Sequence, residues 1–79
     1  MWVVYLLLCE SDNSIYCGIT NNFEKRLLAH RSNKGAKYTK GRGPISVLKI
    51  IEVENKSQAL KLEYKIKRLS KNDKLKLCI

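Results

Sequence analysis

The sequence predicts an α/β fold of the α+β type, a three-stranded antiparallel sheet flanked by helices, in a single small domain over residues 1–79. Two runs of β-prone residues surround a polar turn cluster near the start of the chain, and a third apolar run follows at residues 45–53. Segments with helical patterning lie between and after these runs. A chain of this length can bury one modest core.

The first two runs, Val3–Cys9 and Ile15–Thr20, predict a β-hairpin with its loop at Ser11–Ser14. We expect Cys9 to pair with Tyr16 and Tyr5 with Thr20. One face is then apolar (Val4, Leu6, Leu8, Ile15, Cys17, Ile19), and the other carries Tyr5, Tyr16, Gly18 and Thr20 beside Val3, Leu7 and Cys9. A slip of one residue would separate the tyrosines and place Cys9 opposite Cys17. The first register is preferred because one of its faces is consistently apolar.

A helix is predicted at Phe23–Arg31, with its N-cap supplied by Asn21-Asn22. Phe23 and Leu27 are spaced to face the core, and Arg26 and His30 form a second stripe on an adjacent face. The residues alone allow Arg26 to be a solvated charge and His30 a cation favoured by the helix dipole.

The third predicted strand, Ile45–Val53, is apolar on both faces, which favours a strand covered on both sides. Asn55 and Gln58 resemble a capping box that opens a helix over Lys56–Leu69. The buried stripe of this helix is Ala59, Leu62, Ile66 and Leu69. Ser70 and Asp73 can cap a last short helix that runs through Leu77.

Charge and composition favour an anionic partner. Sixteen Lys and Arg residues against seven Asp and Glu give a formal net charge of +9. Nucleic acid is the first candidate and an anionic membrane surface the second. No apolar run reaches the roughly 20 residues of a membrane span, and Trp2–Cys9 lacks the features of a signal peptide. Three cysteines without C-x-x-C spacing favour a reducing, cytoplasmic location.

The stretch from Ser32 to Pro44 has no periodicity and predicts a basic loop. It could be a disordered linker, but loops of this length inside a small domain are usually functional. Basic side chains contact phosphates, and an aromatic ring among them can stack on a base or sugar. We therefore predict nucleic-acid contacts from the loop's basic residues around Tyr38, which are Lys34, Lys37, Lys40 and Arg42.

Glu63 borders the buried stripe of the second helix and is surrounded in sequence by basic residues. It can form an i,i+4 ion pair with Lys67, worth a few tenths of a kcal/mol. It can also be a metal ligand, because a hard divalent cation can take one carboxylate from the protein and fill its other positions with water and phosphate.

Taken together, these residues resemble the GIY-YIG nuclease family over nearly the whole chain. The resemblance is carried by Val3-Val4-Tyr5, by Tyr16-Cys17-Gly18 eleven residues on, by Arg26 and His30 on the next helix, and by Glu63 on a later one. Gly35-Ala36-Lys37-Tyr38-Thr39 and Arg42-Gly43-Pro44 resemble small stand-alone bacterial members related to the nuclease module of the excision-repair protein UvrC. V-V-Y stands in place of G-I-Y, and Y-C-G in place of Y-I-G.

The resemblance implies an endonuclease that hydrolyses phosphodiester bonds in nucleic acid, with DNA as the expected substrate, using Mg²⁺ or Mn²⁺ held by Glu63. It implies that Tyr5 is the general base or orients the water, that Tyr16 holds the scissile phosphate or the water, and that Arg26 clamps non-bridging oxygens. His30 and Tyr38 are further candidates, for proton shuttling or phosphate contact. We expect Tyr5, Tyr16, Arg26 and Glu63 to converge on one concave surface. The alternatives are a nucleic-acid-binding module that cleaves poorly or not at all, and a protein-interaction adaptor.

Overall fold

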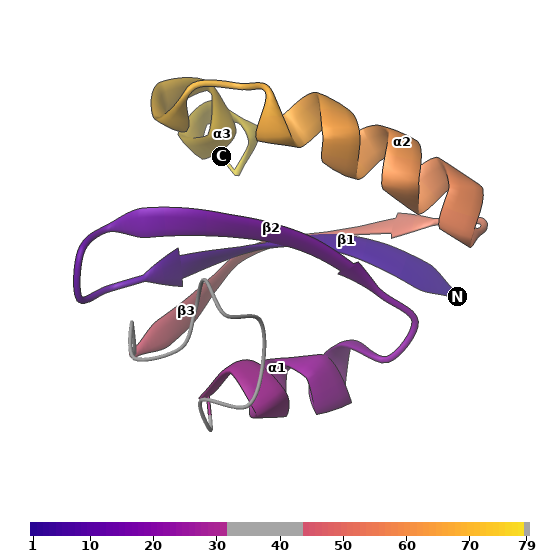
Figure 1. The fold of residues 1–79 in the computed structure, drawn as a ribbon, viewed down its shortest axis with the longest axis horizontal. Helices are drawn as coiled ribbons and strands as arrows, with labels where there is room; N and C mark the ends of the chain where they lie inside the picture. The colour runs from indigo at the N-terminus through magenta and orange to yellow at the C-terminus, as the bar shows by residue number, and fades with distance from the viewer. Residues whose placement is uncertain (32–43, 79) are drawn as a thin grey trace.

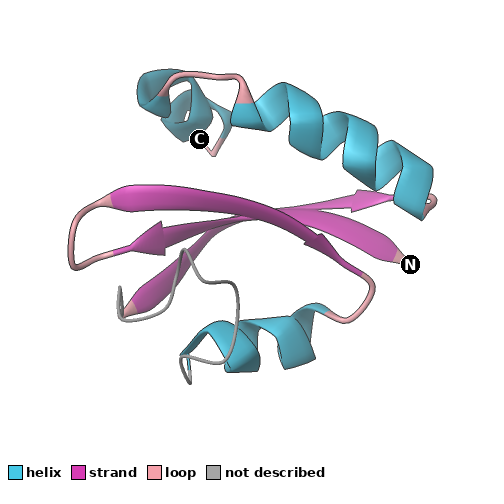
Figure 2. Cartoon of the chain, viewed as in Figure 1, coloured by secondary structure: helices cyan, strands magenta, loops and turns pink. Residues whose placement is uncertain are grey.

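The computed structural model describes residues 1–31 and 44–78, and it confirms the predicted fold class. Its elements, in chain order, are β1 (Trp2–Cys9), β2 (Ser14–Thr20), α1 (Phe23–Arg31), β3 (Ile45–Val53), α2 (Lys56–Lys67) and α3 (Lys71–Leu77). The strands form one antiparallel sheet in the order β2-β1-β3 (Figure 2). The central strand is therefore the first one, and β2 and β3 are the two edges.

Helices cover both faces of the sheet and make three layers. Figure 1 shows α1 below the sheet and α2 with α3 above it. Each interface has its own apolar core, so β1 is buried from both sides. The α1 side contains Val3, Tyr5, Leu7, Cys9 and Ile45, with Tyr16, Phe23 and Leu27 packed against them. The α2 side is built on Val4, Leu6, Cys17, Ala59 and Ile66.

The hairpin differs from the predicted register by two residues. Tyr16 pairs with Leu7 and Tyr5 pairs with Gly18, so the predicted pairs Cys9–Tyr16 and Tyr5–Thr20 are wrong. The turn begins one residue earlier than expected because Asp12 closes it locally: its Oδ1 accepts hydrogen bonds from the Ser14 N–H at 3.1 Å and the Ser14 hydroxyl at 2.6 Å. A shift of two residues preserves the faces, so both tyrosines still lie on one side.

A β-bulge interrupts β3, so its side chains do not alternate regularly between the two faces along the whole strand as the sequence predicted. Leu7 pairs with Val47 and Leu6 with Lys49, so one extra residue of β3 lies between these pairs. Beyond the bulge the faces exchange, and Val47 and Ile50 both fall on the α1 side, where they stay 37% and 44% exposed. The prediction of a strand covered along its length on both faces is therefore wrong for this side.

The helices begin where their capping residues predict. Asn22, Asn55 and Ser70 each accept a hydrogen bond from the backbone N–H three residues later, at 3.2, 2.9 and 3.2 Å. The second helix ends at Lys67, two residues before the predicted end at Leu69. Cys9 and Cys17 lie in the cores on opposite faces of the sheet, and both are free thiols.

Candidate active site

The two tyrosines of the hairpin lie side by side on the α1 face, over a glycine. A Cβ added to Gly18 would lie 2.6 Å from the hydroxyl oxygen of Tyr5 and 2.9 Å from a ring carbon of Tyr16. Real Cβ atoms do not approach other atoms this closely. The missing side chain of Gly18 therefore allows the Tyr5 ring to cross β2 and place its hydroxyl next to Tyr16, with ring centroids 6.2 Å apart.

Helix α1 brings His30 to this pair. The Tyr5 hydroxyl lies 3.0 Å from Nε2 of His30, and both side chains are 1% exposed. The His30 ring also packs edge-on to Tyr5 and lies 5.1 Å from Tyr16 between centroids. The interpretation of His30 as a cation favoured by the helix dipole is therefore wrong, because the ring is buried between α1 and the sheet.

Arg26, one turn before His30 on α1, completes the cluster. Its side chain hydrogen-bonds both Tyr5 and Tyr16, and these bonds raise the pKa of the guanidinium. A guanidinium is only a donor, so both phenol oxygens accept from it. Tyr5, Tyr16, Arg26 and His30 are thus brought together by two strands and one helix.

Tyr5 and His30 are both neutral beside the charged Arg26. Burial raises the pKa of Tyr5 to about 12, although the hydrogen bond from Arg26 acts in the opposite direction. Burial, together with the charge of Arg26, lowers the pKa of His30. At neutral pH a protonated phenol therefore faces an unprotonated imidazole. We assign the Tyr5 proton to the bond with Nε2 of His30, which places the imidazole proton on Nδ1.

Glu63 comes from the other layer of the molecule. It lies on α2, half-buried, with a carboxylate oxygen 3.5 Å from Nζ of Lys67. Its charge contributes to raising the pKa of Cys17, a buried residue of β2 that points away from the tyrosines. The structure therefore does not place Glu63 on the tyrosine face. Its ion-pair partner Lys67 lines one cavity with Tyr16.

A metal at Glu63 would have few protein ligands. Among residues 1–31 and 44–78 no group of three or more His, Cys, Asp and Glu side chains could hold a metal ion. Glu63 fits a hard cation such as Mg²⁺ or Mn²⁺, which can keep most of its water and bind through one carboxylate and a substrate phosphate. It does not fit a structural zinc, which requires four closed ligands.

Two lysines at the β2 edge were missed by the sequence analysis as site residues. The charges of Lys67 and Lys74 both oppose the rise in the pKa of Cys17, so both ammonium groups lie near this strand. They line a cavity of about 370 Å³ together with Ile15, Tyr16 and Cys17. No sequence signal identified Lys74, because only the docking of α3 brings it beside Tyr16.

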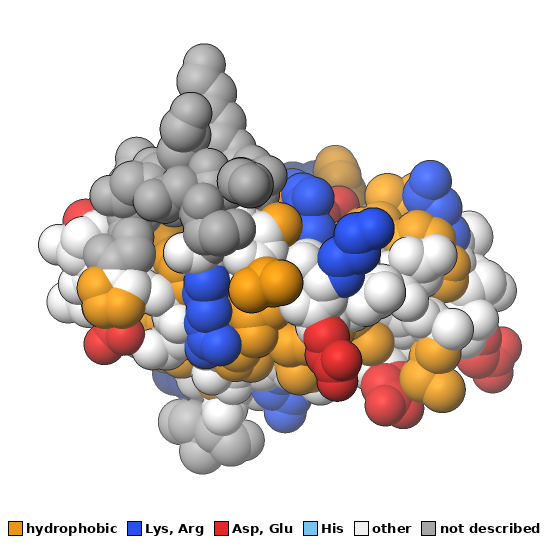
Figure 3. Space-filling model, turned by 90° about the horizontal axis from the view of Figure 1, so that it is seen from below, with side chains coloured by type: hydrophobic (Ala, Val, Ile, Leu, Met, Phe, Trp, Pro, Cys, Tyr) orange, Lys and Arg blue, Asp and Glu red, His pale blue; other side chains and the backbone are white. Residues whose placement is uncertain are grey.

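The predicted loop contacts Lys34, Lys37, Lys40 and Arg42, and the candidate Tyr38, lie outside the described residues. Figure 3 views the described part from the α1 side and shows charged side chains of both signs around exposed hydrophobic ones. Next to the cluster, a cavity of about 210 Å³ is lined by Lys25 and Arg26 from α1 and by the β2–α1 connection. Arg26 is therefore open to an anion from this side.

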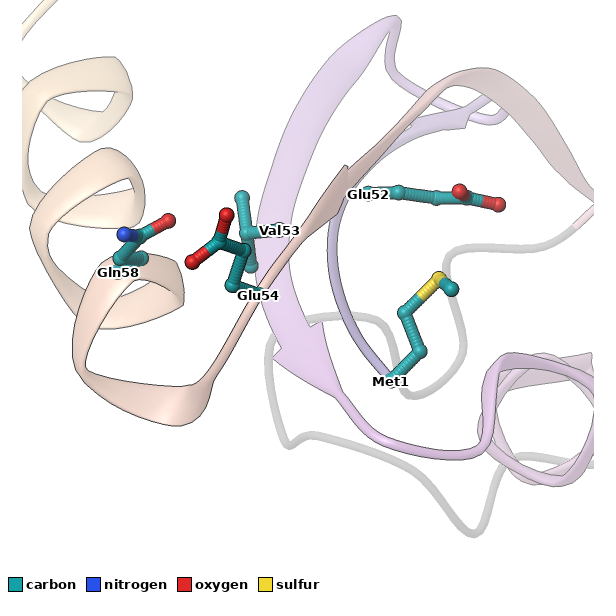
Figure 4. Close-up of a pocket in the computed structure, with 5 residues that line it drawn as sticks. All are labelled: Met1, Glu52, Val53, Glu54 and Gln58. Carbon is teal, nitrogen blue, oxygen red and sulfur yellow. The ribbon is translucent and has the colours of Figure 1, made fainter.

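A larger hollow, of about 580 Å³, lies where β1 begins and β3 ends. Glu52 and Glu54 line it, but Figure 4 shows that their carboxylates point in different directions. They do not converge on a point where one cation could contact both. This hollow therefore gives no competing metal centre.

The site thus combines tyrosines on the central and edge strands of a three-stranded antiparallel sheet with an arginine and a histidine of the next helix. The GIY-YIG catalytic domain model matches residues 1–76, and the chain belongs to this family.

Small proteins with related sequences are found in several bacteria. The chain is 54% identical over 74 residues to UPF0213 protein OB0043 of Oceanobacillus iheyensis, covering 94% of this chain and 85% of that protein. It is 51% identical to UPF0213 protein CPE1444 of Clostridium perfringens, covering 94% and 78%. The solution NMR structure of UPF0213 protein BH0048 from Bacillus halodurans is similar, with a TM-score of 0.61 and 41% identity over 98% of this chain and 82% of that one.

Of the described helices, none is both long enough and apolar enough to cross a membrane.

Proposed function

We propose that this protein is a divalent-metal-dependent endonuclease that hydrolyses phosphodiester bonds in nucleic acid, with DNA as the substrate. The observation that carries the proposal is the position of Arg26, which hydrogen-bonds both tyrosines while it lines a cavity with Lys25. A guanidinium held in this way presents its remaining donors to a phosphate in a fixed orientation. Membership of a family whose model describes a catalytic domain supports the same conclusion.

Tyr16 and Arg26 are the residues proposed to touch the scissile phosphate. Tyr16 is partly exposed, whereas Tyr5 lies behind it with 1% exposure. Arg26 offsets the negative charge that develops on the non-bridging oxygens, and Tyr16 orients the phosphate or the attacking water through its hydroxyl. Both groups are held in place before the substrate arrives, which reduces the reorganisation that the reaction requires.

Tyr5 is proposed to act through its neighbours. A buried phenol with a pKa near 12 is a poor acceptor for a proton unless it passes its own proton on at the same time. His30 provides that acceptor at Nε2, 3.0 Å away. Tyr5 therefore positions Arg26 and, if water reaches its oxygen, relays a proton to His30.

Glu63 is the residue proposed to hold Mg²⁺ or Mn²⁺. When bound, such an ion supplies charge compensation at the phosphate and its leaving oxygen. The protein's own contribution is one half-buried carboxylate at the edge of β2, with Lys67 beside it. Lys67 balances the charge of Glu63 until a cation takes its place.

Cleavage of labelled single-stranded, flap and branched DNA tests the proposal, with Mg²⁺ or Mn²⁺ set against EDTA. We expect cleavage only with the metal. Glu63→Gln keeps the size of the side chain and removes its charge, so it should abolish cleavage and leave binding nearly unchanged. The matched control is Glu54→Gln, which removes a carboxylate from the distant hollow. If Glu63→Gln cleaves as fast as the parent, the assigned metal site is wrong.

A binding module without turnover is the alternative outcome. It would give salt-dependent binding of the same DNAs, with no cleavage under any metal condition.

A further inference from the structure

Two adjoining cavities run along the free edge of β2. The first, of about 370 Å³, contains Tyr16. The second, of about 330 Å³, lies beside the hairpin turn and is lined by Asp12, Asn13, Ser14, Ile15, Lys71 and Lys74. Ile15 and Lys74 line both, so the two cavities lie next to each other, and together we call them the β2-edge groove. It leads from Tyr16 to the turn.

The wall of the groove opposite β2 is basic. It is formed by Lys67 at the end of α2 and by Lys71 and Lys74 on α3. Lys67 is paired with Glu63, whereas Lys74 is half-buried and has no ion-pair partner among the described residues. A half-buried ammonium group has lost part of its hydration, so binding an anion in place of that water stabilises it.

The opposite wall carries fewer negative charges than the basic wall carries positive ones. Asp12 is the acidic residue of the turn, and its Oδ1 is used by the Ser14 N–H and hydroxyl. The remaining lining on this side is the edge of a strand and short uncharged side chains. Lys71 and Lys74, whose charges are not paired within the described part of the chain, and Lys67, which is paired with Glu63, face one engaged carboxylate, so the groove is electropositive. Its lysines come from two helices and line two adjacent cavities, which suits successive phosphates rather than one ion.

We propose that the β2-edge groove binds the phosphates that flank the scissile phosphate on the same nucleic acid strand, through Lys67, Lys71 and Lys74. This inference rests on the proposed function, because it takes Tyr16 as the contact to the scissile phosphate. Since the groove begins at Tyr16, a strand held there can continue directly toward the turn. The groove then fixes the direction in which the strand crosses the site.

A pair of matched double variants tests this assignment. Lys71→Gln with Lys74→Gln removes two charges from the groove, and Lys61→Gln with Lys65→Gln removes two from a separate hollow on the outer face of α2. Binding of a single-stranded oligothymidine and of a duplex is measured as a function of salt. The groove variant should bind more weakly and lower the salt slope for the single strand by about 0.7 for each lost phosphate contact. The outer-face variant should change the slope by much less.

Equal effects of the two double variants would overturn the groove assignment while leaving the proposed function intact. Failure of the parent to bind either probe at low salt would overturn both.

A measurement on the parent protein removes any dependence on how the variants fold. On titration with a short oligothymidine, backbone amide NMR signals of Ser14–Cys17 and Lys71–Lys74 should shift. If binding shifts only signals elsewhere in the chain, the groove is not the binding site.

Discussion

The hydroxyl of Tyr5 and Nε2 of His30 lie 3.0 Å apart between β1 and α1, in a place where each side chain is 1% exposed. With the phenol as the donor, the bond needs a neutral imidazole, since a protonated ring has no acceptor. Burial and the charge of Arg26 lower the pKa of His30 and keep the ring neutral. A contact that is buried and depends on protonation links the stability of the fold to pH.

Stability should therefore fall as the pH is lowered through the ordinary histidine range. The unfolded chain binds a proton near pH 6.5 and the folded chain does not, so the contribution of His30 is fully present above that value and lost below it. His30→Gln keeps a hydrogen-bond acceptor for Tyr5 and removes the titration. Urea unfolding at pH 7.5 and 5.5 should show a smaller difference in free energy for this variant. An unchanged difference would contradict the neutral assignment.

The phenol of Tyr5 should titrate well above the ordinary tyrosine range. Its pKa is raised to about 12, so the folded protein keeps this proton while the unfolded chain loses it near pH 10. Stability from this group is present below about pH 10 and is lost between 10 and 12. Absorbance of tyrosinate should show a late transition that Tyr5→Phe removes. If Tyr5→Phe removes an early transition instead, the burial argument fails.

Gly18→Ala should destabilise the fold by about 1–3 kcal/mol, because the new methyl group overlaps the Tyr5 ring and hydroxyl. Thermal or urea unfolding measures the loss. Combining it with Tyr5→Phe should recover part of the loss, since the closest atom, the hydroxyl oxygen at 2.6 Å, is then gone. Additive effects of the two substitutions would indicate that glycine is needed here for another reason.

Arg26→Lys should lose most turnover while it retains the charge. Lysine cannot hydrogen-bond both phenols and a phosphate in one plane, so the loss should be on the order of 10²–10³-fold, as for removal of one transition-state donor. Single-turnover cleavage at saturating metal measures it. Lys25→Gln, which alters a neighbouring lysine of the same cavity, is the control. An equal loss in Lys25→Gln would mean that the effect is not specific to the guanidinium of Arg26.

Joint neutralisation of Lys34, Lys37, Lys40 and Arg42 should flatten the salt dependence of DNA binding and leave the fold intact. Each phosphate contact contributes about 0.7 to 0.9 to the salt slope, so losing several is readily measured. Circular dichroism and melting check the fold. Unchanged affinity and slope would show that this loop is not a nucleic-acid contact.

Much of this arrangement follows from local sequence. Asn22, Asn55 and Ser70 start the three helices because their side chains satisfy backbone N–H groups that the helix leaves unpaired. The side-chain period of two places Tyr5 and Tyr16 on one face of the hairpin, even though the register predicted for them was wrong by two residues. An error of an even number of residues preserves the face, so the tyrosine pair was predictable where the exact pairing was not.

Features that depend on distant packing were decided by the tertiary structure. The bulge that exposes Val47 and Ile50 depends on how β3 fits against β1, which no local pattern encodes. The burial of His30 depends on α1 closing over the tyrosines, whereas composition alone favoured a cation at the C-terminal end of the helix. The position of Glu63 on the opposite layer, with Lys74 beside the same strand edge, depends on the docking of two helices that the sequence separates from β2 by about 40 residues or more. Sequence periodicity fixes which way a side chain faces on its own element, but only packing between elements decides which faces meet.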